Sequence, residues 1–494
     1  EPHPHVKPPG AVITDVSGRK ARAPSLVSRD GANRRPPKAG TGPSMRLMDG
    51  AFGRVLRNTG YLLGGKAVGS LLHLAALAVA SRSLGPDRFG VVVLVHAFAQ
   101  TVGSLGAFQT WQTVIQFGTP HFTAGRRRAL QHVIAFTAML DLGSGVAAML
   151  VGIALLAVLG SATGIPEAHL GLAMLYCLLI PTMAASTATG LLRMFDRFDL
   201  LAFQSSANAA LRLAGVSIAA ASDAPLAAFV AVWFISDLAA DLLIWSAAWW
   251  QARRRDLTAD FPFEFRAAPR ENRGIWRFSL ATNAATSVAA LLGPALTLWV
   301  GAFLGPAAAG LFRIAFSIVE AASKPGDLMT RAFFPEAARL RAEGKLGQFW
   351  SVSLKVSVLS LLVAVAIVAL LHVGGADWLI WLAFGSEYEP AEPLLKLMAF
   401  ALCATLTLYF LEATLIALGR AGSVLAARTV GALVAFTLLA LLADQLGLEA
   451  AGVAYVAGSV TVVAVTLLLL LRQWLRHRAR QQARPAPPSG DRPA

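Results

Sequence analysis

Charged residues are scarce in this sequence. Asp, Glu, Lys and Arg make up 14% of the 494 residues, against 56% that are hydrophobic, and the mean hydropathy is +0.59. Soluble domains average about 25% charged residues. The shortage excludes an ordinary soluble protein. Apolar runs of about 18 residues or more recur along the chain, and they predict an all-α polytopic membrane protein.

Cysteines and catalytic motifs are also nearly absent. The two cysteines, Cys177 and Cys403, lie in apolar runs, which argues against a disulfide framework. The sequence has no HExxH, no CxxC and no Asp-x-Asp pair. The run Gly60–Ala67 (GYLLGGKA) fails as a phosphate-binding loop, because Ala67 stands where Ser or Thr would hold magnesium. We therefore expect no metal, no cofactor, no ATP hydrolysis and no enzymatic activity.

Twelve apolar stretches have the length of a membrane-spanning helix. We expect them at residues 58–83, 89–118, 130–160, 168–191, 202–221, 225–250, 277–301, 307–334, 349–373, 393–418, 423–443 and 450–472. Lys and Arg gather in the connections on one side, as in Arg126–Arg128 and Arg253–Arg255, whereas the other side has only Arg82 and Arg88 near its loops. The positive-inside rule then places both termini in the cytoplasm. It also explains the net charge of +15 without nucleic acid.

Composition and an internal repeat divide the chain into five parts. We expect disordered basic tails at residues 1–44 and 475–494, six-helix lobes at 45–251 and 277–474, and a cytoplasmic linker at 252–276. Because residue 1 is Glu and the segment from residue 45 (MRLMDGAFGRVLRN) is a basic lead-in to the first helix, we expect translation to start there.

The motif LGPDRFG follows the first expected helix and LGPAAAG follows the seventh, at residues 84–90 and 304–310. Two halves with the same orientation indicate parallel repeats about an axis along the membrane normal, which is a transporter layout.

The eighth expected helix carries a polar stripe. Its charged residues are Arg313, Glu320, Lys324, Asp327 and Arg331. At 100° per residue these fall within about 60° of one another, and the stripe is about 27 Å long. Each charge would cost about 2.5–3.5 kcal/mol in lipid, so the stripe must face protein or water. Alternatively, Glu320 and Lys324 simply neutralise one another between packed helices. Pro325 favours a cavity, because it leaves the carbonyl of Ala321 without its usual partner.

Three segments resemble polysaccharide flippases of the Wzx type, which belong to the MOP superfamily together with the MATE exporters. They are SRSLGPDRFGVVVLVHAF, GAFLGPAAAGLFRIAFSIVEAASKPGDLMTRAFFPEAARL and WLIWLAFGSEYEPAEPLLKLMAF. The resemblance implies a MATE-like fold with two lobes around a central cavity, in the bacterial inner membrane. The implied cargo is an undecaprenyl-pyrophosphate-linked oligosaccharide, and the implied partners are membrane lipids, a polysaccharide polymerase and other assembly proteins.

Polar residues inside the expected helices are the site candidates, and contact between helices is the alternative role for each. Candidates for lining the lumen and binding substrate are Lys66, Arg212, Arg313, Lys324, Gln109, Gln112, Gln116 and Asn208; the four cations suit a pyrophosphate. Candidates for coupling to an ion are Asp141, Asp237, Asp241, Glu320, Asp327 and Glu412.

Two other functions compete with oligosaccharide flipping. The first is export of small molecules in the MATE manner, or flipping of lipid II; the cations in the expected lumen argue against drug export. The second is a polysaccharide polymerase or ligase, which needs a catalytic group on a long outer loop. The longest expected outer loop, residues 374–392, offers Asp377, Glu387, Glu389 and Glu392.

Overall fold

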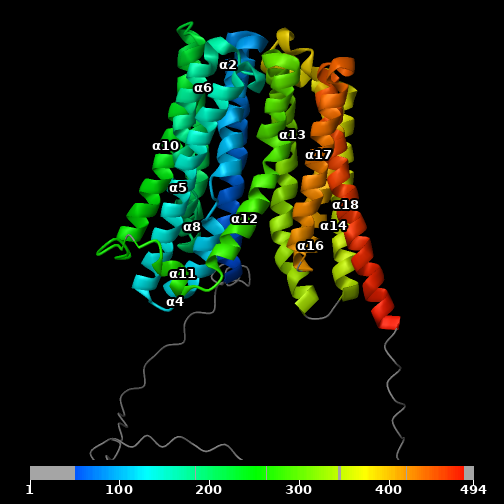
Figure 1. Ribbon diagram of the computed structural model, residues 1–494. Helices are drawn as coiled ribbons and strands as arrows, with labels where there is room; N and C mark the ends of the chain where they lie inside the picture. The colour runs from blue at the N-terminus through cyan, green and yellow to red at the C-terminus, as the bar shows by residue number, and fades with distance from the viewer. Residues whose placement is uncertain (1–50, 184, 263, 343–345, 419, 483–494) are drawn as a thin grey trace, which may run out of the picture. The chain divides into compact units, whose positions relative to one another are not determined.

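The computed structural model describes residues 51–482 except residues 184, 263, 343–345 and 419. Nine helices in this part are long and apolar enough to cross a membrane. Figure 1 shows them side by side, and the described residues contain no strand. The prediction of an all-α polytopic membrane protein is confirmed. The expected N-terminal tail, residues 1–44, lies outside the described residues.

The first bundle is formed by the helices up to residue 253. They are α2 (Ala51–Gly106), α3 (Trp111–Thr113), η1 (Val114–Gly118), α4 (Thr119–Thr123), α5 (Arg127–Leu159), η2 (Gly160–Thr163), η3 (Glu167–His169), α6 (Leu170–Tyr176), η4 (Cys177–Leu179), α7 (Ile180–Met183), α8 (Ser186–Met194), α9 (Phe198–Ala221) and α10 (Leu226–Arg253). Within it α10 packs against α8 and α9, and α5 packs against α7.

The second bundle is formed by the helices from residue 296 onward. They are α13 (Leu296–Ala342), α14 (Leu346–Leu370), η6 (Leu371–Gly375), α15 (Ala376–Phe384), η7 (Ser386–Tyr388), α16 (Ala391–Ala417), α17 (Ala421–Leu446) and α18 (Leu448–Gln482). Here α16 contacts α13, α14 and α18. Between the bundles lie α11 (Ala267–Glu271), α12 (Ile275–Ala289) and η5 (Leu291–Ala295), and α12 contacts both α3 and α17. The expected outer loop at residues 374–392 is thus partly helical.

The two copies of the LGP motif form the same turn. Gly85 (φ 70°, ψ 169°) and Gly305 (φ 86°, ψ 175°) take a backbone conformation that is open essentially to glycine alone, and each divides a long helix in two. Pro86 and Pro306 follow, at the first position of a new helix, where a missing N–H costs nothing. Each motif therefore ends one helix and starts the next. The total of twelve spans stays a prediction, since α9 and α12 are not among the nine helices that are long and apolar enough to cross a membrane.

The glycines that close the two motifs let the bundles touch. A Cβ atom added to Gly90 would lie 1.8 Å from the carbonyl oxygen of Pro306, and one added to Gly310 would lie 3.2 Å from the backbone of Gly90. Side chains cannot fit at such distances, so the backbones of α2 and α13 meet there directly. The repeat thus marks the place where the two halves are in contact.

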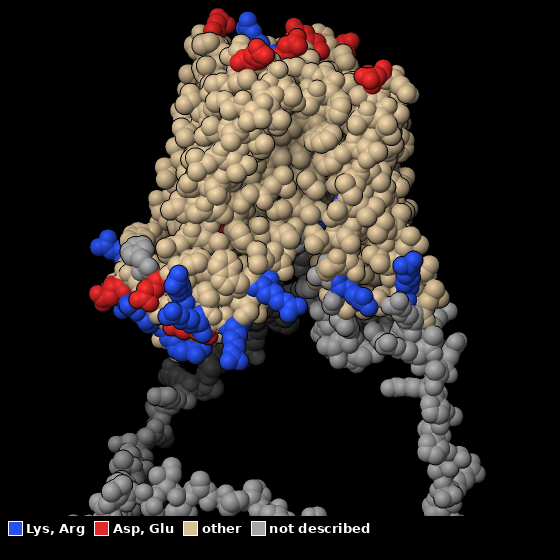
Figure 2. Space-filling model, in the orientation of Figure 1, with Lys and Arg blue, Asp and Glu red and all other residues tan. Residues whose placement is uncertain are grey.

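Charge separates the two ends of the molecule. Figure 2 shows Lys and Arg gathered at one end and mainly Asp and Glu at the other. The basic end carries Arg126–Arg128, Arg193, Arg197 and Arg253–Arg255, and the acidic end carries Asp87, Glu167, Asp223, Glu387, Glu389, Asp444 and Glu449. The Gly90–Pro306 contact follows directly on the Gly85 turn, at the acidic end, so the bundles are joined there.

Candidate functional site

Three adjoining polar cavities lie between and beside the bundles. The central cavity, of about 500 Å³, is lined chiefly by α2, η5, α13, α16 and α18, with Arg428 from α17. The lateral cavity, of about 420 Å³, lies between α2, α9 and α13 and shares His73, Arg313 and Glu320 with the central one. The inner cavity, of about 330 Å³, is lined by the first bundle; it shares Gln100 with the central cavity and Gln204 with the lateral one. Each volume falls in the range of about 300–1,000 Å³ that is usual for small-molecule sites.

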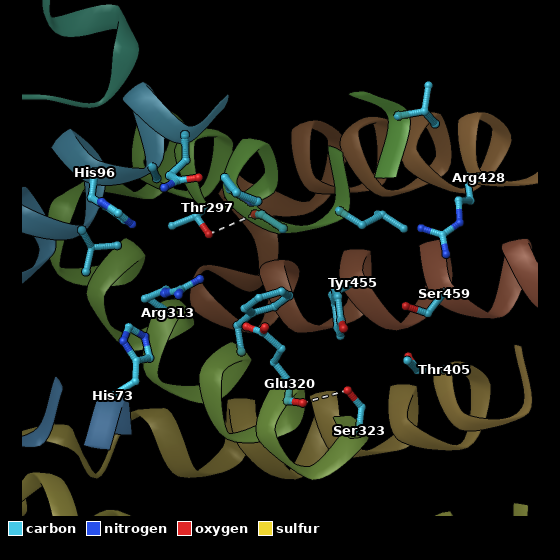
Figure 3. Close-up of a pocket in the computed structure, with 18 of the residues that line it drawn as sticks. His73, His96, Thr297, Arg313, Glu320, Ser323, Thr405, Arg428, Tyr455 and Ser459 are labelled. Carbon is cyan, nitrogen blue, oxygen red and sulfur yellow. Dashed lines mark hydrogen bonds between the residues drawn. The ribbon is translucent and has the colours of Figure 1, made fainter. Parts of the chain in front are cut away.

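Arg313 stands where the central and lateral cavities meet. Figure 3 shows its side chain beside His73, with His96 on the same side and Glu320 farther along the cavity. Its guanidinium lies 5.6 Å from the centre of the Phe316 ring. No residue in the described part of the chain forms a hydrogen bond or ion pair with it. Among the described residues this charge therefore has only the Phe316 ring and, at longer range, the Glu320 carboxylate near it.

The polar stripe of α13 faces these cavities as far as its side chains are described. The Lys324 ammonium donates a hydrogen bond to Ser70 Oγ on α2 at 2.9 Å and lies 3.9 Å from a Glu320 carboxylate oxygen. The opposite side of the helix is packed in the core, with Ala315 and Ile318 buried. The side chains of Lys66, Asp327 and Arg331 lie outside the described residues. Both expectations for the stripe thus hold in part: Glu320 and Lys324 pair, and they also line the lateral cavity.

Arg212, by contrast, is fully engaged in a buried network. Its guanidinium pairs with the Asp237 carboxylate and donates to Ser236 Oγ at 3.0 Å. Asp237 also accepts hydrogen bonds from Asn208 at 3.1 Å and from the Tyr176 hydroxyl at 3.2 Å. Arg212 and Asn208 line the lateral cavity, but the charge of Arg212 is already neutralised by Asp237 and both residues already donate to that carboxylate. This network joins α6, α9 and α10 and is suited to holding the first bundle together.

A second buried ion pair involves Arg428, which the sequence analysis missed. Its guanidinium forms two bonds with the Glu412 carboxylate, at 2.7 and 2.8 Å, between α17 and α16. Arg428 also lines the central cavity, on the side away from Arg313 (Figure 3). The signal was present in the sequence, since a single arginine in an apolar run is costly unless it is paired or faces water.

The remaining candidates are separated by the fold. Asp141 is buried outside all three cavities and accepts two hydrogen bonds from Thr187, from its amide at 2.8 Å and from its hydroxyl at 2.7 Å. Asp241 and Gln109 line the inner cavity together. Gln112 and Gln116 line none of the three cavities.

Two spans are broken where the inner cavity lies. The expected helix at 89–118 is interrupted at residues 107–110, and its amides bond to side chains instead: Phe108 N–H to Ser144 at 2.8 Å and Gln109 N–H to Asn283 at 3.2 Å. In the expected helix at 168–191, α7 ends at Met183 and α8 begins at Ser186; Ala185 forms a turn between them, and residue 184 is not described. Trp111 N–H, just after the first break, donates to Ser186, just after the second, at 3.1 Å. Irregular backbone inside a membrane protein is tolerated where protein satisfies it or a cavity adjoins it.

Comparison with known proteins identifies the family. The model of the family described as "polysaccharide biosynthesis protein" matches residues 55–341, more than half of the chain. The inner membrane protein YghQ of Escherichia coli (strain K12) is 38% identical over 351 residues, which cover 70% of this chain and 97% of that protein. The chain belongs to the polysaccharide biosynthesis protein family. The predicted membership is confirmed.

The fold of this polysaccharide biosynthesis protein is similar to those of solved transporter structures. An inward-facing MATE multidrug resistance transporter matches with a TM-score of 0.67 at 14% identity, covering 84% of this chain and 96% of that chain. A MOP superfamily transporter from Pyrococcus furiosus, described as having a binding pocket of reverse polarity, matches with a TM-score of 0.56 at 15% identity, covering 90% and 100%. The MATE-like fold predicted for the chain is confirmed.

Proposed function

We propose that this protein is a flippase that moves an undecaprenyl-pyrophosphate-linked oligosaccharide across the bacterial inner membrane by alternating access. The family membership and the fold support a membrane transporter that acts in polysaccharide biosynthesis. The observation that carries the proposal is the Arg313 guanidinium in the central cavity, which forms no hydrogen bond or ion pair with a described residue.

The cargo is assigned from the balance of charges along the cavities. Arg212 and Arg428 are neutralised by Asp237 and Glu412. Arg313 is left over among the described residues, and Lys324 beside it has a carboxylate only at 3.9 Å. A cavity with spare positive charge suits an anionic cargo, and a diphosphate gains most from an arginine shielded from water.

The alternative functions have less support. An exporter of organic cations needs spare negative charge in the cavity. The carboxylates of Asp237 and Glu412 are bonded to arginines and Glu320 lies beside Lys324, so Asp241 is the one cavity carboxylate without a described cation beside it. A polymerase or ligase needs a free catalytic group at the outer end. Asp377, one of the acids offered there, is paired with Lys396 at 3.0 Å.

The orientation follows from the two ends of the molecule. Lys and Arg gather at the basic end (Figure 2), and the positive-inside rule places that end in the cytoplasm. The bundles are joined at the acidic end by the Gly90–Pro306 contact. The proposed state is therefore closed toward the periplasm, and both chain ends lie on the cytoplasmic side.

The test is transport of a labelled lipid-linked trisaccharide by the purified protein in vesicles. Arg313→Ala should reduce the rate at least tenfold, since a charge-assisted hydrogen bond contributes about 1.5–3 kcal/mol. Lys324→Ala should reduce it less, and Arg313→Lys should recover part of the loss. The matched control is Arg88→Ala, an exposed arginine at the acidic end. Wild-type transport by both alanine variants, at equal protein levels, would remove the proposal.

A further inference from the structure

The inner cavity differs in chemistry from its two neighbours. Its polar lining comes from Gln100, Ser104, Gln109, Thr189, Gln204 and Asp241. Within the part of the chain that the structure describes, no Lys or Arg side chain lines it, whereas Arg313 lines both of the adjoining cavities. Its one charged group, the Asp241 carboxylate, accepts a hydrogen bond from Thr182 at 3.1 Å. An anion would be repelled here, while a neutral ligand rich in hydroxyl groups would find both donors and acceptors.

The walls of the inner cavity are built for contact with a ligand. Two broken spans meet there and are joined by the bond from Trp111 N–H to Ser186. Asp141 stabilises the start of α8 after the second break, because its carboxylate accepts hydrogen bonds from the amide and the hydroxyl of Thr187. Interrupted helices contribute to binding sites in many transporters, because the interruption leaves polar backbone groups that protein or a ligand must satisfy. Trp111 and Phe108 add aromatic surface to the same wall.

The three cavities together divide one binding space into a part lined by Arg313 and a part that no described cation lines. Gln100 stands on the border with the central cavity and Gln204 on the border with the lateral one. A ligand that has a diphosphate joined to a sugar fits this division, with its anionic part near Arg313. The inner cavity, at about 330 Å³, is near the lower limit of small-molecule sites. It suits one or two sugar units rather than a whole chain.

We propose that the inner cavity binds an uncharged sugar unit of the lipid-linked saccharide, next to its pyrophosphate, and so selects the cargo by its glycan. This inference rests on the proposed function and deepens it. Gln109 supplies an amide and Asp241 a carboxylate that bind sugar hydroxyls. Both residues line the inner cavity, and neither lines the central or the lateral cavity.

Two probes separate the sugar from the pyrophosphate. Binding is measured for undecaprenyl pyrophosphate without sugar and for the same lipid with one hexose, by the full-length protein in nanodiscs. The test variants are Gln109→Leu and Asp241→Asn. The matched control is Gln116→Leu, which changes the same residue type on the same span, seven residues farther on and outside the cavities. Thermal unfolding of each variant checks that it is folded.

Each test variant should weaken binding of the hexose lipid about tenfold and leave the bare lipid within twofold, since about one hydrogen bond is lost. Gln116→Leu should change neither affinity, and Arg313→Ala should weaken both. Equal losses for the two lipids, or no loss in either folded test variant, would overturn the sugar site. If the wild-type protein binds neither lipid, the proposed function falls as well. The two failures can be told apart. If the wild-type protein binds both lipids and each variant affects the two lipids equally, only the sugar site is overturned.

Discussion

The substitution Gly90→Ala should open the acidic end of the molecule. The added Cβ would lie 1.8 Å from the carbonyl oxygen of Pro306 on the facing bundle, far inside any possible contact distance. The clash is with backbone, so no side-chain rotation relieves it and the helices must separate. Overpacking of this kind costs about 1–3 kcal/mol. The cost falls only on the state in which α2 and α13 touch.

A cost of about 1–3 kcal/mol changes a two-state equilibrium by about 5- to 150-fold. If about 1% of the wild-type protein is open at the acidic end, the variant should be about 5–60% open. Spin labels on Glu167→Cys and Asp444→Cys, exposed positions at the acidic end of the first and second bundles, measure this as a longer distance between labels. The native Cys177 and Cys403 are replaced beforehand.

Gly143→Ala is the control for this experiment. Gly143 also lies inside a spanning helix, α5, but a Cβ added there meets no atom within 4 Å. Its distance distribution should match that of the wild-type protein. If Gly90→Ala is folded and shows the same distribution as Gly143→Ala, the contact of the two LGP motifs does not hold the acidic end closed.

Two further predictions concern stability. Arg428→Gln should destabilise the protein by about 3–5 kcal/mol, because it leaves the Glu412 side chain, 9% exposed, without its partner; the double variant with Glu412→Gln should recover most of the loss, as thermal unfolding in detergent would show. Burial and the neighbouring Glu387 carboxylate raise the pKa of Tyr388, whose hydroxyl donates to the Ser81 carbonyl at 3.0 Å. The folded state then keeps the phenol proton that the unfolded state loses, so stability should fall as pH rises above about 10, and Tyr388→Phe should flatten that fall.

The backbone of the fold was readable because its turns depend on local chemistry. The LGP repeat predicted two matching helix boundaries, and Gly85 and Gly305 form them with nearly the same φ and ψ. The helix ranges also follow from hydropathy, since a spanning segment must be apolar over a fixed length. What the repeat could not show is that Gly90 and Gly310 touch, because the close approach of two helices depends on packing over more than 200 residues of sequence.

The broken spans could not be predicted for a similar reason. Residues 107–110 follow an apolar run and contain no proline or glycine, so the sequence favoured an unbroken helix. The break is stable because Ser144 and Asn283, from two other helices, accept the hydrogen bonds of the exposed amides. Asp141 illustrates the same dependence on tertiary structure. Its position inside a span suggested ion coupling, while in the fold its carboxylate is bonded to Thr187 beside the second break.

Pairing between helices decides which charges are free to bind a cargo. In sequence Arg212, Arg313, Lys324 and Arg428 are equivalent, since each is a cation in an apolar span. In the fold Arg212 and Arg428 form ion pairs with carboxylates of neighbouring helices, and bonds of that kind hold a bundle together. Arg313 makes no such bond to any described residue, and only the Phe316 ring and the more distant Glu320 carboxylate offset its desolvation there. A buried charge of this kind needs a further stabilising contact, and an anionic ligand in the central cavity would provide one.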